Sequence, residues 1–287
     1  MTFSELSSRL ICAGIAPDDA RHEALLLAER FAGVSPAMLL ADRERELDSP
    51  ALAHAVERRC AREPLQYILG EWEFCGLCIK VDGRCLIPRP DTEIVAERAA
   101  ALLPENGRFL DLCTGSGCIA AAVCALSADR HTTGVALELI PETARLAREN
   151  LEALGFGDRC TVVTADLRDD PFGEGNALFD VIVSNPPYVT AQEMTELAPE
   201  LAWEPREALT DGGDGLSLIA AILRLYRKHL APGGVLLLEH GWRQADAVRR
   251  MAEAEGYEYA CLRDYGGNVR AAEMRRIQNG TGLNIFR

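Results

Sequence analysis

The spacing of apolar and polar residues divides the chain into a helical first part and a longer part in which strands and helices alternate. Asp18 and Asp19 can cap a helix that Gly33 ends, and Ser35-Pro36 and Ser49-Pro50 open two more. Four apolar residues lie at helical spacing in the first of these helices: Ala24, Leu25, Ala28 and Phe31. β-Branched residues are scarce in this segment. The pattern therefore predicts a small all-helical bundle.

The pattern changes near residue 72. Residues 73–81 alternate between apolar and polar positions around Gly76, which predicts a short β-hairpin. Pro88-Arg89-Pro90 forms a stiff extended linker, and Asp91 or Thr92 can cap the helix that follows. We therefore expect a helical bundle over 1–72, a hairpin and linker over 73–90, and a further domain over 91–287.

From Arg108 onward, short apolar runs alternate with amphipathic helical segments. The expected strands cover residues 109–112, 133–137, 161–164, 180–183 and 234–238, and the expected helices cover Cys118–Ser127, Pro141–Leu154, Leu216–Leu230 and Arg243–Glu255. Strands that are apolar throughout are typical of a parallel sheet covered by helices on both faces. The sequence thus predicts an α/β fold with a doubly wound parallel sheet.

Composition and charge narrow the class of protein. Of the 287 residues, 48% are hydrophobic and 26% are charged, which is typical of a globular protein and excludes a largely disordered one. The formal net charge is -14. This charge argues against a general nucleic-acid binder, because such a protein needs a basic surface to displace counterions from phosphates.

Three further features indicate a reduced, cytoplasmic protein. A chain of this length can bury a sizeable core, so its 10 cysteines need not form disulfides. Residues 1–5 show no basic segment and no apolar segment of a secretory signal. The longest uncharged stretch, residues 112–128, is interrupted by Thr114-Gly115-Ser116-Gly117 and fits a strand, a turn and a helix better than a membrane span.

A glycine-containing turn, Cys113-Thr114-Gly115-Ser116-Gly117, follows the first expected strand of the α/β part. Its two glycines let the backbone approach a ligand in front of a helix N-terminus. Glu138 ends the next strand, where a carboxylate can accept hydrogen bonds from both hydroxyls of a ribose. Together they predict a nucleotide-type site. The turn is not a P-loop, because no Lys-Ser/Thr pair follows it, and Thr114 replaces the glycine that a nucleophilic Ser116 would need.

Asp166 follows the third expected strand. Taken alone, it is best interpreted as a loop acid or a helix cap. The carboxyl ends of parallel strands meet at one edge of a sheet, so Asp166 is also expected near Glu138. There it could accept a hydrogen bond from the exocyclic amine of a bound base.

The most specific motif is Asn185-Pro186-Pro187-Tyr188, directly after the fourth strand. Two prolines alone would make a stiff turn. However, the side-chain carbonyl of Asn185 and the backbone carbonyl of Pro186 can both accept from one NH2 group, and neither proline can donate in competition. The motif therefore predicts a clamp for an amine.

Three other patterns favour structural roles. Cys75 and Cys78 lack the second cysteine pair that a zinc site usually needs. The run Asp211-Gly212-Gly213-Asp214-Gly215 begins like a calcium loop, yet its twelfth position holds isoleucine where such a loop has glutamate. Glu239 and His240 are expected to form a buried, hydrogen-bonded pair rather than to supply a catalytic base. We predict no metal site.

Together with the glycine-containing turn, the motif at 185–188 resembles that of S-adenosylmethionine-dependent amino-methyltransferases. With the helical N-terminal part, three more stretches are similar to the bacterial-type peptide chain release factor glutamine N5-methyltransferase family: Leu-Ile-Pro-Arg-Pro-Asp-Thr-Glu at 86–93, Leu-Leu-Glu-His-Gly-Trp at 237–242 and Arg-Asp-Tyr-Gly at 263–266. The resemblance covers nearly the whole chain. The four-residue motif is shared with DNA adenine and RNA guanine methyltransferases, whereas the stretch Pro88–Glu93 is much more specific.

The resemblance implies a Rossmann-like S-adenosylmethionine-dependent methyltransferase domain behind a small all-helical N-terminal domain. The implied reaction moves a methyl group to the side-chain amide nitrogen of a glutamine in release factors, and residues 1–72 would dock that substrate. The implied cofactor contacts are Cys113, Thr114, Gly115, Ser116, Gly117, Glu138, Asp166, Leu167 and Asn185. The glutamine would contact Asn185, Pro186, Pro187 and Tyr188, with Asn185, Pro186 and Tyr188 carrying the catalysis. The family usually has glycine where Cys113 stands, so this side chain is expected to crowd the methionine part of the cofactor.

Three alternatives stay open. An amino-methyltransferase acting on an RNA or DNA base would use the same clamp, but the net charge of -14 disfavours it. A nicotinamide-dependent enzyme would explain the turn and Glu138 and leave the motif at 185–188 without a role. A protein that binds S-adenosylmethionine without catalysis is disfavoured by the same motif. We expect no stable nucleic-acid binding and no membrane association.

Overall fold

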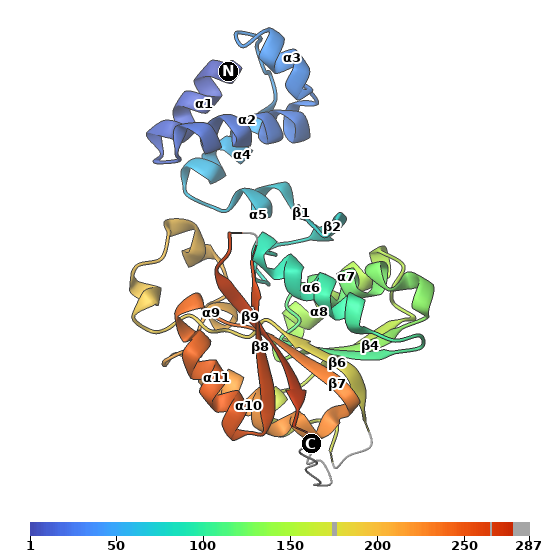
Figure 1. Ribbon diagram of the computed structural model, residues 1–287. Helices are drawn as coiled ribbons and strands as arrows, with labels where there is room; N and C mark the ends of the chain where they lie inside the picture. Colours follow the sequence, from blue (N-terminus) through green and yellow to red (C-terminus); the bar gives the residue numbers. More distant parts are fainter. Residues whose placement is uncertain (174–176, 265, 278–287) are drawn as a thin grey trace, which may run out of the picture.

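The computed structural model describes residues 1–173, 177–264 and 266–277. A helical N-terminal unit lies at one end of a larger α/β domain, and a small β-hairpin lies between them (Figure 1). Tyr265, which belongs to one of the stretches that carry the family resemblance, lies outside the described residues, as do the last ten residues of the domain predicted over 91–287.

Five helices form the N-terminal unit: α1 (Phe3–Cys12), α2 (Pro17–Ala32), α3 (Pro36–Ala41), α4 (Pro50–Cys60) and α5 (Leu65–Leu69). Leucines from three of these helices make its core. Leu6 and Leu10 of α1 meet Leu27 of α2 and Leu52 of α4, and all four are fully buried. Ser49 caps α4, because its Oγ accepts a hydrogen bond from the backbone of Leu52.

Two details predicted for α2 are wrong. The helix begins at Pro17, so Asp18 and Asp19 lie inside its first turn and do not cap it. They still favour the helix, because negative charge near an N-terminus interacts well with the helix dipole. Leu25 and Phe31 are only half-buried, because other residues form the buried face. That face consists of Ala20, Ala24, Leu27 and Ala28.

The hairpin consists of β1 (Glu71–Phe74) and β2 (Leu77–Lys80), paired antiparallel across a two-residue turn. Cys75 and Gly76 form the turn and have φ of 49° and 73°. Two successive positive φ values match the right-handed twist of the flanking strands. The predicted hairpin is confirmed, and Cys75 serves as a turn residue.

Asn150 of α8 (Pro141–Ala153) fixes this hairpin to the α/β domain. Its Oδ1 accepts a hydrogen bond from the backbone N–H of Lys80 at 2.9 Å, and its Nδ2 donates to the Lys80 carbonyl at 3.0 Å. The same Nδ2 donates to the carbonyl of Ser116 in the glycine-containing turn at 2.8 Å. Glu149 adds ion pairs to Lys80 and Arg84. The hairpin and the turn are therefore held by one helix.

Seven strands form the main sheet: β3 (Arg108–Leu112), β4 (Thr133–Glu138), β5 (Cys160–Thr164), β6 (Phe179–Ser184), β7 (Leu230–Glu239), β8 (Tyr257–Arg263) and β9 (Val269–Arg276). Their order is β5-β4-β3-β6-β7-β9-β8. The five predicted strands are present and run parallel. Two further strands that were not predicted, β9 and β8, add an antiparallel edge.

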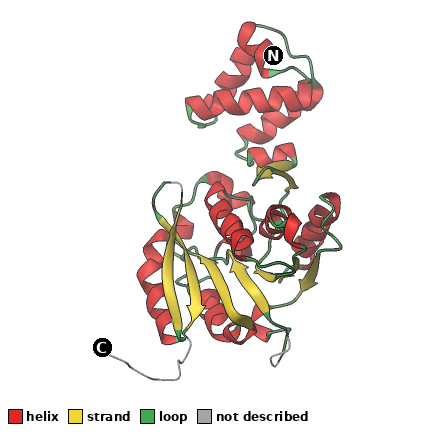
Figure 2. Ribbon diagram, turned by 45° about the vertical axis from the view of Figure 1, so that its right-hand side comes forward, coloured by secondary structure: helices red, strands yellow, loops and turns green. Residues whose placement is uncertain are grey.

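Helices cover both faces of this sheet (Figure 2). One face carries α6 (Pro90–Leu102), α7 (Cys118–Leu126) and α8 (Pro141–Ala153), and the other carries α10 (Ser217–Leu225) and α11 (Ala245–Ala254). The strands supply both layers by alternation. Val181 and Val183 of β6 belong to the first core layer, and Ile182 belongs to the second.

Two predicted helix boundaries are wrong. The helix expected over Leu216–Leu230 ends at Leu225, a short 3-10 turn follows, and Leu230 already begins β7. α6 begins at Pro90 and has no side-chain cap, so neither Asp91 nor Thr92 plays the capping role predicted for it.

A buried arginine connects the N-terminal unit to the α/β domain. Arg59 of α4 is 4% exposed and pairs with Glu23 of α2 at 2.7 Å. It also pairs with Glu200 at 3.0 Å, and Arg62 contacts the same carboxylate at 2.7 Å. Glu200 lies in the segment that follows the motif at 185–188. Removing one partner of such a pair would leave a buried charge uncompensated, so the contact fixes the two units together.

Within the described residues, no helix combines the length and the apolarity needed to cross a membrane.

Gly134 tests the packing of β4 against β3. A Cβ at this position would lie 2.2 Å from Cζ of the fully buried Phe109 ring. We expect Gly134→Ala to lower the free energy of unfolding by about 1–3 kcal/mol, because a packed core resists added volume. Gly83→Ala is the matched control, since a Cβ there meets nothing within 4 Å. Denaturant unfolding of both variants measures the difference, and equal stabilities would contradict this account.

Candidate active site

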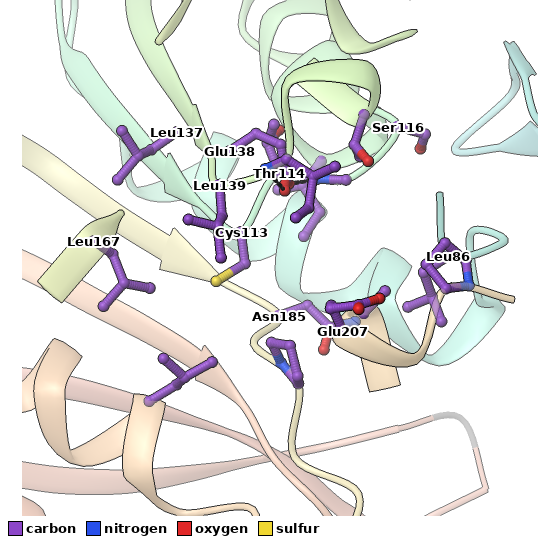
Figure 3. A pocket seen from close by; sticks show the side chains of 18 of the residues that line it. Leu86, Cys113, Thr114, Ser116, Leu137, Glu138, Leu139, Leu167, Asn185 and Glu207 are labelled. Atoms are coloured by element: carbon purple, nitrogen blue, oxygen red, sulfur yellow. Dashed lines mark hydrogen bonds between the residues drawn. The ribbon is translucent and has the colours of Figure 1, made fainter. Parts of the chain in front are cut away.

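A cavity of about 280 Å³ lies at the carboxyl ends of β3, β4, β5 and β6 (Figure 3). The parallel register brings its walls together. Leu112 of β3 pairs with both Leu137 of β4 and Ser184 of β6, so the residue after each of these three starts at the same level of the sheet. Of the predicted site residues, these line the cavity: Cys113, Thr114, Gly115, Ser116, Glu138, Asp166, Leu167, Asn185 and Pro187. Gly117, Pro186 and Tyr188 are not among its lining residues.

The glycine-containing turn alternates left-handed and ordinary backbone. Cys113, Gly115 and Gly117 have φ of 59°, 57° and 81°. A Cβ on Gly115 would meet nothing within 4 Å, so the backbone there is open to a ligand. A Cβ on Gly117 would lie 3.2 Å from Cβ of Ala147 in α8. Gly117 therefore permits helix packing, which explains why it lies behind the cavity wall.

Asp111 supports the turn from below. Its side chain is fully buried, and its Oδ2 accepts a hydrogen bond from the Thr114 hydroxyl. The backbone N–H of Thr114 donates to the Leu137 carbonyl of β4 at 3.0 Å. Burial raises the pKa of Asp111 to about 7, and the hydrogen bond from Thr114 opposes that rise. The turn is thus fixed to two neighbouring strands.

Glu138 ends β4 with its carboxylate at the cavity wall. Its Oε2 accepts from the backbone N–H of Gly115 at 2.9 Å, and its Oε1 accepts from that of Ile140 at 3.0 Å. Burial raises the pKa of Glu138, and these amide hydrogen bonds oppose the rise. A carboxylate offers about four lone-pair directions, so these amide hydrogen bonds still leave room for a ligand. This arrangement agrees with the predicted contact to a diol.

Asp166 combines the two roles considered for it. It caps a short 3-10 helix, Leu167–Asp169, by accepting from the backbone N–H of Arg168 at 2.8 Å. It also lines the cavity. The Arg168 side chain pairs with it and lowers the pKa of Asp166. That arginine side chain is 61% exposed, so it can move aside for a ligand.

The carboxamide of Asn185 binds a neighbouring side chain through its NH2 group and turns its oxygen toward the cavity. Its Nδ2 donates to Oγ1 of Thr92 at 3.1 Å, which leaves its oxygen to face a ligand. Tyr188 turns away from the cavity, and its hydroxyl donates to Oε1 of Glu239 at 3.0 Å. Burial raises the pKa of Tyr188 above its usual range. Neither the half-buried Tyr188 nor the buried Pro186 lines the cavity, and the expected packing of Tyr188 on the reacting group stays a prediction.

Several lining residues carried no sequence signal of their own. One group comes from the linker and the start of α6: Arg84, Leu86, Pro88, Arg89 and Thr92. For all of these except Arg84, the family-like stretch at 86–93 was the pointer to a functional role. A second group surrounds the short helix α9 (Arg206–Leu209): Pro205, Glu207, Ala208, Thr210 and Asp211. Glu207 lies near Asn185 in Figure 3. Only the fold brings this segment to the cavity.

The expected hydrogen-bonded pair of Glu239 and His240 is not formed. Adjacent strand residues point to opposite faces, so Glu239 meets Tyr188 while Nδ1 of His240 faces the Gly241 carbonyl at 2.9 Å. Asp211 accepts hydrogen bonds from the backbone ahead of α10, as expected of a loop residue. In the part of the chain that the structure describes, no group of three or more potential ligands could hold a metal ion.

Comparison with known proteins gives the family. A PrmC N-terminal domain matches residues 3–70, and a methyltransferase small domain matches residues 92–232. The release factor glutamine methyltransferase of Cereibacter sphaeroides is 40% identical, covering 93% of this chain and 94% of its own. That of Escherichia coli is 35% identical, covering 92% and 95%. The solved structure of a methyltransferase from Pyrococcus furiosus has the same fold, with a TM-score of 0.51 and 20% identity over 69% of this chain and 88% of that one.

The chain therefore belongs to the release factor glutamine methyltransferase family. The family predicted from the sequence is confirmed. The predicted fold class is confirmed as well: a methyltransferase α/β domain follows a helical N-terminal domain.

Cys113 occupies a backbone position that suits glycine. Its φ of 59° is unfavourable for a residue with a Cβ, and its side chain lies at the cavity wall. We expect Cys113→Gly to fold at least as stably and to bind S-adenosylmethionine equally well or more tightly. Gly115→Ala is the matched control, because it adds a Cβ to the same turn and should weaken binding. Calorimetry measures both dissociation constants, and binding at least tenfold weaker in Cys113→Gly would refute the expectation.

Proposed function

We propose that this protein transfers a methyl group from S-adenosylmethionine to the side-chain amide nitrogen of a glutamine in peptide chain release factors. One observation carries the proposal. A single cavity joins a nucleotide-type pocket at the ends of β3, β4 and β5 to the carboxamide of Asn185 at the end of β6. Its relatives, matched over more than nine tenths of this chain, are named release factor glutamine methyltransferases.

The residues at the nucleotide end suit S-adenosylmethionine. The open backbone at Gly115 admits the methionine part, and Glu138 has lone pairs left for the ribose hydroxyls. Asp166 and Leu167 border the position expected for the adenine, one offering an acceptor and the other an apolar contact. Leu139 and Ile140 extend that apolar wall.

At the other end, the chain must orient a poor nucleophile. S-adenosylmethionine supplies a methyl group on a positively charged sulfur that leaves readily. The amide nitrogen of glutamine is weakly nucleophilic, because its lone pair is delocalised into the carbonyl. Asn185 can accept one of its N–H bonds, and Pro187 forms the wall beside it. Positioning and fixed dipoles then supply most of the catalysis. No base is required before attack, since the nitrogen releases its extra proton readily afterwards.

Residues 1–72 are proposed to dock the release factor. None of the residues that line the cavity precedes Arg84, so the helical unit makes no contact with the reacting groups. Its buried contact through Arg59 holds it at a fixed place beside them.

We place the reaction in the cytoplasm, in keeping with ten cysteines that are all free thiols. The net charge of -14 gives no support to stable nucleic-acid binding.

Asn185→Ala should separate binding from catalysis. We expect S-adenosylmethionine to bind nearly as well as to the wild type, and methyl transfer to fall by about a hundredfold or more. The reason is that this change removes the acceptor that orients the substrate amine. Calorimetry and a single-turnover assay on the same preparation measure the two effects, with thermal melting as the control for folding. Unchanged turnover would remove Asn185 from the mechanism.

Labelled S-adenosylmethionine and a purified release factor test the function directly. We expect label on one glutamine, located by mass analysis, and none on a release factor in which that glutamine is replaced by asparagine.

An acidic enzyme should be attracted to the basic surface expected around a loop that works against ribosomal RNA. Association should therefore slow as salt rises from about 50 to 300 mM. Labelling of naked ribosomal RNA or duplex DNA, with none on the protein, would favour the nucleic-acid alternative.

A further inference from the structure

A buried polar cluster lies directly behind the motif at 185–188, and one of its members, Thr92, reaches the cavity wall. Glu239, at the carboxyl end of β7, is its centre and is 1% exposed. Its Oε1 accepts the hydroxyl hydrogen of Tyr188 at 3.0 Å. Its Oε2 is buried and has no hydrogen-bond partner among the described residues. A buried carboxylate oxygen without a donor is costly, so a nearby hydroxyl is expected to turn toward it.

Thr92 is that hydroxyl. It lies in the first turn of α6, is 2% exposed and also lines the cavity. Its Oγ1 accepts a hydrogen bond from Nδ2 of Asn185 at 3.1 Å. The hydroxyl is also close enough to Glu239 to favour the charged form of that carboxylate. Thr92 therefore stands between the carboxylate of Glu239 and the carboxamide of Asn185.

The order of donors in this cluster follows from the chemistry of its members. An ionised carboxylate can only accept, so the Tyr188 hydroxyl donates to Oε1 of Glu239, and we expect the Thr92 hydroxyl hydrogen to turn toward the unpartnered Oε2. The Thr92 oxygen is then left with lone pairs, and it selects the NH2 end of Asn185. A carboxamide has two ends of nearly equal shape, and only its hydrogen-bond partners decide which way it faces. The oxygen of Asn185 is thereby turned toward the cavity.

We propose that Thr92 and Glu239 are positioning residues that fix the carboxamide of Asn185 with its oxygen, and not its NH2 group, facing the amine of the substrate. The inference rests on the proposed function for its substrate, but the orientation itself can be observed without substrate. A reversed carboxamide would present N–H to N–H and repel the group that it should hold. Neither residue belongs to the motif at 185–188.

Charge around the cluster adds a pH dependence. Of the described residues, Arg270 of β9 and Asp91 of α6 influence Glu239 by their charge, and Arg270 pairs with Asp91 at 3.0 Å. Burial raises the pKa of Glu239 to about 7 and Asp91 acts in the same direction, whereas Thr92, Tyr188 and Arg270 oppose the rise. The orienting form is the ionised one, which is the minority below pH 7 and the majority above it. The single-turnover rate should therefore rise about tenfold from pH 6 to pH 8.

Thr92→Val and Thr92→Ser form the decisive pair, because valine keeps the shape of threonine and serine keeps its hydroxyl. At saturating release factor, we expect the valine variant to lose about thirtyfold or more in single-turnover rate and the serine variant to regain most of it. The dissociation constant for S-adenosylmethionine should change by less than about threefold in both. Thr132→Val is the control, because it removes another fully buried hydroxyl outside the cavity and should affect melting only.

A spectroscopic measurement reads the orientation without any substrate. The NH2 signals of Asn185 are identified by their loss in Asn185→Ala. In the wild type they should shift with an apparent pKa near 7, and in Thr92→Val that shift should vanish. Failure of the wild type to label a release factor would refute the proposed function while this signal still decides the orientation. A valine variant within threefold of the wild-type rate, a serine variant as slow as valine, or an unchanged titration would overturn the positioning role.

Discussion

The parallel alignment of β3 between β4 and β6 is the constraint on which the site depends. Leu112 is level with residues of both neighbours, so Cys113, Glu138 and Asn185 follow at the same height of the sheet. No loop has to reach across the molecule to bring them together. The pleat then decides what each side chain faces, because a shift of one residue would turn every one of them to the opposite face. A site built on this edge is therefore as precise as the hydrogen-bond ladder beneath it.

The parallel strands could be predicted because they are buried on both faces and read as short apolar runs. The edge strands β8 and β9 could not. β9 mixes charged residues such as Arg270 and Glu273 with alanine, since one side of it carries ion pairs to α6. The helix predicted to run to Leu230 shows a related limit, because a 3-10 turn over Arg227–His229 follows α10 before β7 begins. Periodicity alone does not separate two adjoining buried elements.

The site could be predicted where a single short motif specifies both the backbone conformation and the functional group. The glycine-containing turn and Asn185 are of this kind. Thr92 and Glu239 are not. Both lie in stretches that carry the family resemblance, at 86–93 and 237–242, but their contacts with the motif arise only when α6, β6 and β7 meet. Tyr188 has a contact that the motif did not predict. Its place in the motif suggested contact with the substrate, yet its hydroxyl serves a buried carboxylate on the next strand. A motif therefore predicts which residue types a site contains, whereas the packing of the strands determines the direction of each side chain.

Asn150 has a consequence for how the helical unit is placed relative to the cavity. The two family matches leave residues 71–91 between them, a place where a flexible joint would be expected. Instead, Asn150 and Glu149 of α8 bind this connection on both its backbone and its side chains. Arg59, paired with Glu200, adds a second contact between the helical unit and the α/β domain. Under the docking proposed above, a partner bound to the helical unit would reach the cavity only with a loop that spans the distance between them.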